Sequence, residues 1–136
     1  MIKVENLRKV FGPKVAVDDV SFTVQKGEVL GFLGPNGAGK STTMRMVTGF
    51  FAPTAGKVSV GGVDMLENPQ QAKKSIGYLP ENAPLYSDMS VSGFLGFCAE
   101  LRGLHGAAKS KAVDHAVELC FLQGVRNQSV DTLSKG

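Results

Sequence analysis

The sequence predicts an α/β protein, and three observations support this fold class. An apolar segment, residues 28–33, is followed by a glycine-rich loop and then by a segment that favours a helix. The residues before it alternate between apolar and polar positions, as strands with one buried face do. After residue 90, apolar residues recur at helical spacing instead. Strands followed by helices in this order are typical of layered α/β domains.

The first 30 residues are expected to form strands. Apolar and polar residues alternate loosely up to Phe11, where Gly12-Pro13 predicts a turn. Residues 16–24 continue with a clear period of two. One face of this second strand is predicted to carry Val20, Phe22 and Val24.

The middle of the chain is expected to alternate strands with helices. Residues 28–33 are nearly all apolar, which predicts a strand buried on both faces, as in a parallel sheet covered by helices. A helix is predicted over residues 40–47, and Gly49 is suited to the position just past its end. Three further elements are expected: a strand over 57–60, a short helix over 69–74 and a strand over 75–79.

Two amphipathic helices are predicted after residue 90. In the first, apolar residues recur at i, i+3, i+4, i+7 and i+10 from Val91, and Ser90 is a suitable N-cap. Residues 102–106 would form the hinge between the helices. The apolar stripe of the second helix is predicted to comprise Val113, Ala116, Val117, Cys120 and Phe121.

Composition limits the classes of function. The net charge is +3, from 15 Lys and Arg and 12 Asp and Glu, and the basic residues are scattered. A nucleic-acid partner is therefore not expected. The N-terminus lacks the apolar segment of a signal peptide, and no apolar run approaches the roughly 18 residues of a membrane span. These features predict a soluble chain, which could still dock on a membrane protein.

The segment GPNGAGKST, residues 34–42, matches the phosphate-binding pattern G-x-x-x-x-G-K-[ST]. Glycines let successive N–H groups point inward, and the following helix adds its positive N-terminal end. Lys40 can reach the β- and γ-phosphates, the Ser41 hydroxyl can ligate Mg²⁺, and Thr42 is placed for an α-phosphate oxygen. The alternative is an ordinary glycine-rich turn, but the strand and helix predicted on either side favour nucleotide binding. The other expected phosphate contacts are Gly34, Pro35, Asn36, Gly37, Ala38 and Gly39.

Several motifs, in order along the chain, resemble one family. VFGPKVAVDDVSF from Val10 is similar to a first hairpin with a base-stacking aromatic, and GPNGAGKST to a Walker A loop. TGFFAPTAGKVSVGGVD follows as in that family, IGYLPE aligns with a Q-loop, and LSKG from Leu133 resembles the start of the LSGGQ signature. The chain thus resembles the nucleotide-binding domain of an ATP-binding cassette (ABC) transporter. YLPE and LRG are similar to the ABC-2, multidrug and gliding-motility exporter branch.

The resemblance implies ATP and Mg²⁺ as cofactors and assigns residue roles. Phe11 would stack on adenine with Ala16 beside it, although a buried strand aromatic and a plain core alanine are the alternatives. Lys40 would stabilise developing charge. Glu81 stands where the family usually has Gln and would serve catalysis and Mg²⁺ with Ser41, or else be an exposed loop carboxylate. Contacts to a second domain's ATP would come from Ser134 and Gly136.

The resemblance also predicts the domain plan. Residues 1–136 would be an incomplete nucleotide-binding domain: a P-loop NTPase core with an N-terminal antiparallel β subdomain in 1–80, then the Q-loop, a helical subdomain and the start of the signature in 81–136. The Walker B strand, the catalytic Glu and the switch His of the family are absent, so hydrolysis by these residues alone is in doubt.

The resemblance implies two partners, a transmembrane permease and a second nucleotide-binding domain in a homo- or heterodimer. Such a subunit would lie at the cytoplasmic face of the cell membrane and couple ATP binding and hydrolysis to transport, most simply export. Two alternatives stay open: a non-hydrolysing nucleotide-binding fragment, and a soluble ABC-type ATPase without a membrane partner.

Overall fold

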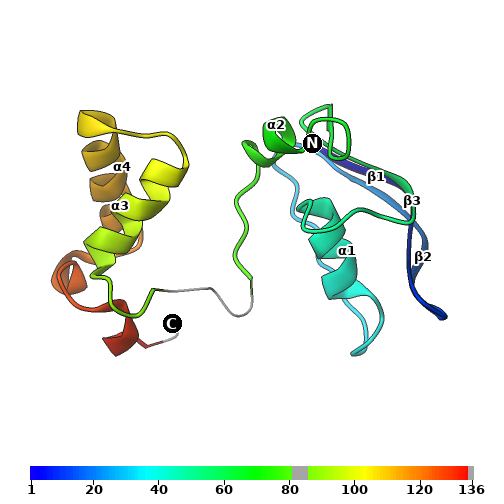
Figure 1. The fold of residues 1–136 in the computed structure, drawn as a ribbon, viewed down its shortest axis with the longest axis horizontal. Helices are drawn as coiled ribbons and strands as arrows, with labels where there is room; N and C mark the ends of the chain where they lie inside the picture. Colours follow the sequence, from blue (N-terminus) through cyan, green and yellow to red (C-terminus); the bar gives the residue numbers. More distant parts are fainter. Residues whose placement is uncertain (81–85, 135–136) are drawn as a thin grey trace. The chain divides into compact units, whose positions relative to one another are not determined.

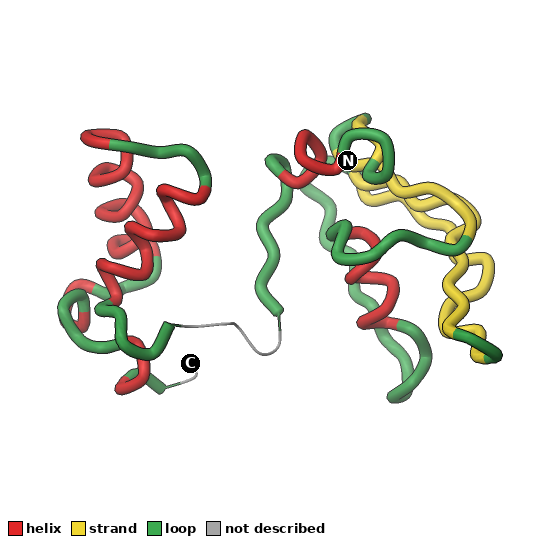
Figure 2. Tube along the Cα trace, viewed as in Figure 1, coloured by secondary structure: helices red, strands yellow, loops and turns green. Residues whose placement is uncertain are grey.

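The computed structural model describes residues 1–80 and 86–134 of the 136-residue chain, and Figure 1 shows its elements. The chain forms two compact units, Met1–Leu79 and Pro80–Gly136. The first contains all the strands and the glycine-rich loop, and the second is helical (Figure 2).

The first unit is built on an antiparallel sheet with strand order β2-β1-β3-β4. The hairpin predicted for the first 30 residues is present, with a two-residue connection between its strands. β3 begins two residues before the predicted segment. The strands are β1 (Ile2–Phe11), β2 (Lys14–Val24), β3 (Ala55–Val60) and β4 (Val63–Asp64).

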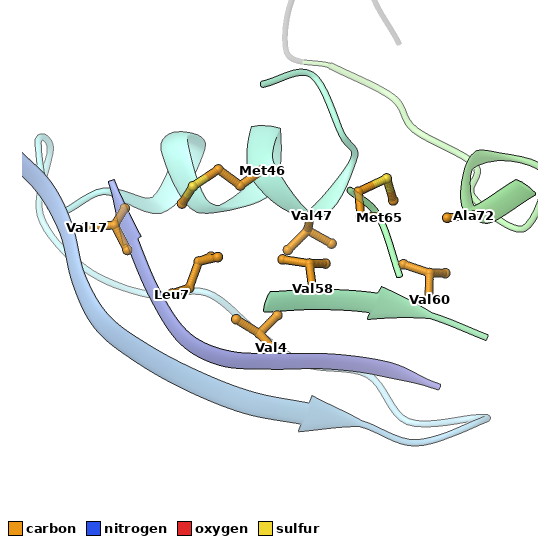
Figure 3. Close-up of a cluster of buried hydrophobic side chains, with 9 residues drawn as sticks. All are labelled: Val4, Leu7, Val17, Met46, Val47, Val58, Val60, Met65 and Ala72. Atoms are coloured by element: carbon orange, nitrogen blue, oxygen red, sulfur yellow. The ribbon is translucent and has the colours of Figure 1, made fainter. Parts of the chain in front are cut away.

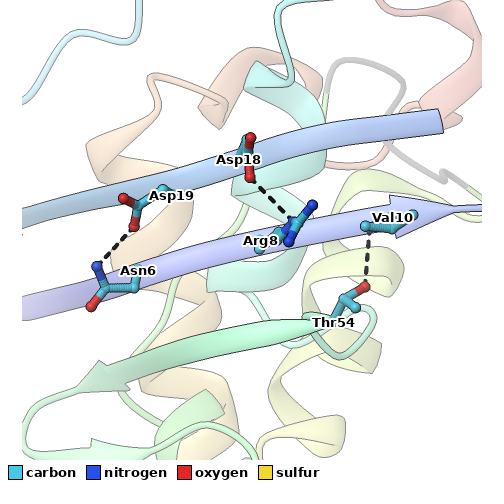
Figure 4. Close-up of polar contacts among 6 residues, drawn as sticks. All are labelled: Asn6, Arg8, Val10, Asp18, Asp19 and Thr54. Carbon is cyan, nitrogen blue, oxygen red and sulfur yellow. Dashed lines mark hydrogen bonds and ion pairs between the residues drawn. The ribbon is translucent and has the colours of Figure 1, made fainter.

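Bulges bend the long hairpin. Asn6 and Asp19 have left-handed backbone conformations, with φ of 46° and 50°, and the Asn6 side-chain amide donates to Asp19 Oδ1 at 2.8 Å (Figure 4). Between them, Arg8 Nε lies 3.2 Å from Asp18 Oδ1. Extra residues of this kind strengthen the local twist of a hairpin. The curved hairpin can then wrap one side of the helix that packs on it.

Helix α1 (Lys40–Val47) supplies the second layer of the first unit. It spans the predicted residues, and Gly49 follows it in the left-handed conformation expected there (φ 66°). Figure 3 shows Met46 and Val47 of α1 directed at the sheet face that carries Leu7. The buried core consists of Val4, Leu7, Val17, Met46, Val47, Val58, Val60, Met65 and Ala72, the last from α2 (Pro69–Lys73).

Two predicted strands are not formed. Residues 28–33 and 75–79 have no strand structure, and within the described ranges no strand pairs with either segment. Val29 and Leu33 are each 95% exposed, and Leu79 is 84% exposed. A strand obtains its hydrogen bonds only from neighbouring strands. The prediction was wrong here because an apolar segment forms a buried strand only where neighbouring strands pair with it, and its own composition does not reveal whether such strands exist.

The second unit is a helical pair closed by its own C-terminal segment. α3 (Val91–Leu101) matches the first predicted amphipathic helix, and Ser90 Oγ accepts a hydrogen bond from the Gly93 N–H at 3.1 Å, as its predicted N-cap role requires. Val91 N–H donates to Gln128 O at 3.0 Å, which ties the start of α3 to the end of the unit. The remaining elements are α4 (Gly106–Leu119) and the 3₁₀ turns η1 (Gln123–Val125) and η2 (Val130–Thr132).

The second predicted helix ends earlier than its apolar pattern suggests. α4 stops at Leu119, so Cys120 and Phe121 lie beyond it, and both side chains are exposed. Phe121 adopts φ 55° and is 88% exposed. That left-handed conformation is incompatible with a continuing helix. Within the described ranges, no helix is both long and apolar enough to cross a bilayer.

Candidate phosphate-binding site

The glycine-rich loop adopts a conformation that only glycine tolerates well. Gly37 and Gly39 have φ of 85° and 87°, in the left-handed region. Gly39 is also the N-cap of α1, and a Cβ at this position would collide with the carbonyl oxygen of Ala16 on β2. The loop and β2 therefore approach each other closely because residue 39 has no side chain.

The start of α1 presents free backbone donors. The first intrahelical hydrogen bond runs from Thr43 N–H to Gly39 O at 2.8 Å. The N–H groups of residues 40–42 precede this bond, and no side chain caps this end of the helix. Three donors at the positive end of a helix form a ready binding site for an anion.

A pocket of about 210 Å³ lies where these donors meet the hairpin. Among the described residues, its lining carries two lysines and no carboxylate. Two residues of β2 form one side of it, and the loop with the first turn of α1 forms the other. The lining residues are Lys14, Ala16, Asn36, Gly37, Gly39, Lys40, Ser41 and Thr42.

Lys40 is folded back over the loop. Its ammonium donates to the carbonyl oxygens of Gly34 and Pro35, the second at 2.7 Å. Both acceptors are neutral, and hydrogen bonds from an ammonium to a charged oxygen are about twice as strong as bonds between neutral groups. The structure thus places the cation of Lys40 in the lining of the pocket, with partners that a phosphate oxygen could replace.

A bulge in β2 brings a second residue of the hairpin to the pocket. The register changes from Lys9↔Val17 to Val10↔Val15, so Ala16 is an extra residue on β2. Ala16 lines the pocket while Val17 is buried in the core. The interpretation of Ala16 as a plain core residue is therefore incomplete, because this half-buried residue also lines the pocket.

Phe11 is not the buried strand aromatic of the alternative interpretation. Its side chain is 47% exposed, and its ring meets Phe51 edge to face, with centroids 5.7 Å apart. Lys9 Nζ lies 5.2 Å from the Phe11 centroid. Phe11 pairs with Lys14 across the hairpin but is not among the residues that line the pocket. An exposed aromatic face beside the pocket is compatible with base stacking.

Other predicted site residues fall outside this pocket. Pro35 and Ala38 are exposed on the loop, joined by an Ala38 N–H to Pro35 O hydrogen bond at 3.3 Å. Ser134 is exposed in the second unit. Glu81 and Gly136 lie outside the described residues.

Lys14 was missed as a site residue at the level of sequence. The residue begins β2 directly opposite Phe11, and the pattern of the glycine-rich loop does not extend to it. Its position could have indicated it. Lys14 lies two residues before Ala16, on the strand that the resemblance already placed near the nucleotide. No group of three or more His, Cys, Asp or Glu side chains gathers as a metal site in the described part of the chain.

Curated relatives of this chain are ATP-binding proteins, which is consistent with the geometry of the glycine-rich loop. The chain is 37% identical over 136 residues to the probable multidrug ABC transporter ATP-binding protein YbhF of Escherichia coli (strain K12), covering all of this chain and 24% of that protein. It is 37% identical over 137 residues to the linearmycin resistance ATP-binding protein LnrL of Bacillus subtilis (strain 168), covering all of this chain and 44% of that protein. The chain thus spans less than half the length of these relatives.

A solved structure of an ATP binding subunit of an ABC transporter superposes with a TM-score of 0.86 at 27% identity, over 99% of this chain and 56% of that chain. This likeness confirms the predicted fold class, an α/β ATPase cassette with an antiparallel β subdomain and a helical subdomain. The sequence model of the family described as ABC transporter matches residues 17–136. The chain belongs to the ABC transporter family.

Proposed function

We propose that the chain forms the nucleotide-binding part of an ABC transporter ATPase and that its pocket holds the phosphates of ATP. One observation carries the proposal: the glycine cradle, the open N-terminus of α1 and two lysines converge on one pocket, whose described lining has no carboxylate. Such a pocket suits an anion of several negative charges. A nucleotide triphosphate is the ligand of this kind that the G-x-x-x-x-G-K-[ST] pattern binds.

The residues of the pocket have distinct proposed roles. The N–H groups of residues 40–42 would hold phosphate oxygens, and Lys40 would exchange its two carbonyl partners for phosphate. Ser41 is exposed in the lining and offers the hydroxyl oxygen that Mg²⁺ prefers, with Glu81 as the proposed second metal ligand. Mg-ATP, when bound, would supply the phosphoanhydride bond that is cleaved.

The proposed setting is a membrane exporter. One relative is named a probable multidrug transporter protein and the other a linearmycin resistance protein. The chain would then act at the cytoplasmic face of the membrane, bound to a permease and to a second nucleotide-binding domain. Ser134 and Gly136 would face the ATP of that second domain, and Phe11 would stack on the adenine.

A second candidate is ATP binding without hydrolysis by these residues alone. Among the described residues, the lining of the pocket holds no carboxylate that could orient an attacking water, and Glu81 lies outside those residues. Phosphoryl transfer normally needs such a residue in addition to the P-loop. Turnover of Mg-ATP by the 136-residue chain itself would contradict this candidate, whereas binding without turnover would support it.

Titration with Mg-ATP tests the proposed function. The wild-type protein is expected to bind Mg-ATP, and Lys40→Met is expected to weaken binding by at least about tenfold, since it removes a charge-assisted partner of the phosphates. Lys57→Met is the matched control, because Lys57 is an exposed lysine of β3 outside the pocket. Equal affinity of the Lys40→Met variant and the wild type would refute the assignment of this pocket.

A further inference from the structure

Lys14 occupies a special position in the hairpin. It is the first residue of β2, follows the turn at Gly12-Pro13 and pairs directly with Phe11 on β1. Its exposed side chain lines the pocket on the side opposite the glycine-rich loop. The phosphate cradle therefore has a lysine on each of its two walls, Lys14 on the hairpin and Lys40 on the helix.

The two lysines differ in their partners. The Lys40 ammonium is bonded to two loop carbonyls, whereas the Lys14 ammonium has no hydrogen-bond or ion-pair partner among the described residues. In the part of the chain that the structure describes, no carboxylate lines the pocket to neutralise either charge. An exposed cation that lines the pocket and has no partner among the described residues can bind a ligand without breaking a contact to any of them.

Neighbouring cations of the hairpin are already engaged. Lys9 Nζ donates to Ala52 O at 2.6 Å and lies 4.9 Å from the Phe51 ring centroid. Arg8 is paired with Asp18. The positive charge that the hairpin contributes to the pocket is therefore the ammonium group of Lys14.

We propose that Lys14 is a further phosphate-binding residue, which contacts the nucleotide's phosphate chain from the hairpin side. The inference rests on the proposed function, since it adds a residue to the same pocket. The placement of Ala16 supports it, because Lys14 and Ala16 of β2 both line the pocket while Val17 is buried in the core. Lys14 and Lys40 would then hold the phosphates from opposite walls.

Isothermal titration with two ligands, Mg-ATP and Mg-tripolyphosphate, tests the inference. Lys14→Met is expected to weaken the binding of both ligands by the same factor, about three- to tenfold, as for one exposed cation at a charged ligand. Lys14→Arg should retain most of the affinity because it keeps the charge. Lys57→Met changes the net charge equally from outside the pocket and should leave both affinities unchanged.

The outcomes separate the inference from the proposed function. If the wild type binds neither ligand, the proposed function fails. If the wild type binds both and Lys14→Met binds them equally well, only the role of Lys14 is refuted. A loss for Mg-ATP without a loss for Mg-tripolyphosphate would also refute it, since that places Lys14 at the ribose or base. Thermal unfolding of Lys14→Arg and Lys14→Met, compared with the wild type, identifies any loss due to misfolding.

Discussion

The segments on the two sides of the glycine-rich loop have opposite structures. Residues 28–33, before the loop, form no strand and expose Val29 and Leu33 almost completely. α1, after the loop, is regular from Lys40 to Val47 and buries Met46 and Val47 in the core. The two segments are only a few residues apart, so their position in the sequence does not explain why one is buried and the other exposed.

The difference lies in where each segment finds its hydrogen bonds. A helix satisfies its backbone groups within itself, and α1 needs only one apolar face to pack on the sheet. The backbone groups of a strand form hydrogen bonds with other strands, and those strands can be far away in the sequence. The described residues supply partners to β1, β2 and β3 but not to residues 28–33.

The largest expected effect compares buried and exposed apolar residues on the two sides. Met46→Ala should lower the free energy of unfolding by about 2–5 kcal/mol, because it opens a cavity beneath α1. Val29→Ala should change it by less than about 0.5 kcal/mol, because the side chain is exposed. Urea unfolding of both variants measures this, and equal losses would mean that residues 28–33 pack in solution.

The next effect compares two glycines. Gly39→Ala should destabilise the protein by about 1–3 kcal/mol, because the left-handed φ and the carbonyl of Ala16 both oppose a Cβ. It should also weaken Mg-ATP binding. Gly31→Ala is the matched control, since a Cβ there meets open space. Denaturation measures the stability of the two variants, and titration measures their affinity for Mg-ATP. Equal stability and equal affinity would contradict the close approach of the loop to β2.

Elements that depend on nearby residues were predictable from the sequence. The bounds of α1 and α3 were predicted correctly because their apolar spacing, Ser90 and Gly49 act within one or two turns. The structure of residues 28–33 and the end of α4 were not predicted correctly. A strand at residues 28–33 would depend on remote strands, and the end of α4 depends on the backbone conformation of Phe121.

The candidate site was predictable where a motif encodes it. The cradle from Gly34 to Thr42 follows from a local pattern, and the pocket contains most of those residues. Lys14 joins it through pairing across the hairpin and a bulge, which a pattern of consecutive residues does not encode. The roles proposed for Glu81 and Gly136 stay predictions, since both residues lie outside the described ranges.

A smaller effect contrasts the N-termini of two helices. α1 has no side-chain cap and presents open donors to the pocket, whereas the Ser90 hydroxyl caps α3. Ser90→Ala should cost about 1 kcal/mol of stability, and Ser90→Asp should restore most of it, because a carboxylate can accept the same hydrogen bond. Thermal unfolding of the two variants measures this. Equal loss in both would show that Ser90 acts through packing rather than as a cap.

The smallest effect comes from an ion pair between neighbouring helices. Lys109 Nζ of α4 lies 2.6 Å from Glu100 Oε1 of α3. The hydrogen bond from Lys109 lowers the pKa of Glu100, and the charges of Lys109 and, less strongly, His105 lower it further. Because the folded-state pKa lies below the unfolded one, the stabilisation is complete above the unfolded pKa and is lost as the pH falls through the folded pKa.

Glu100→Gln should therefore lower the melting temperature slightly at neutral pH. The difference from the wild type should shrink as the pH falls into the range where the Glu100 carboxylate is protonated, and also in high salt, which screens exposed charges. Melting curves from neutral to acidic pH, at two salt concentrations, measure both trends. A difference that stays constant with pH would mean that the loss does not depend on the ionisation of Glu100. The ionised pair would then add nothing to the local contacts that hold α3 on α4.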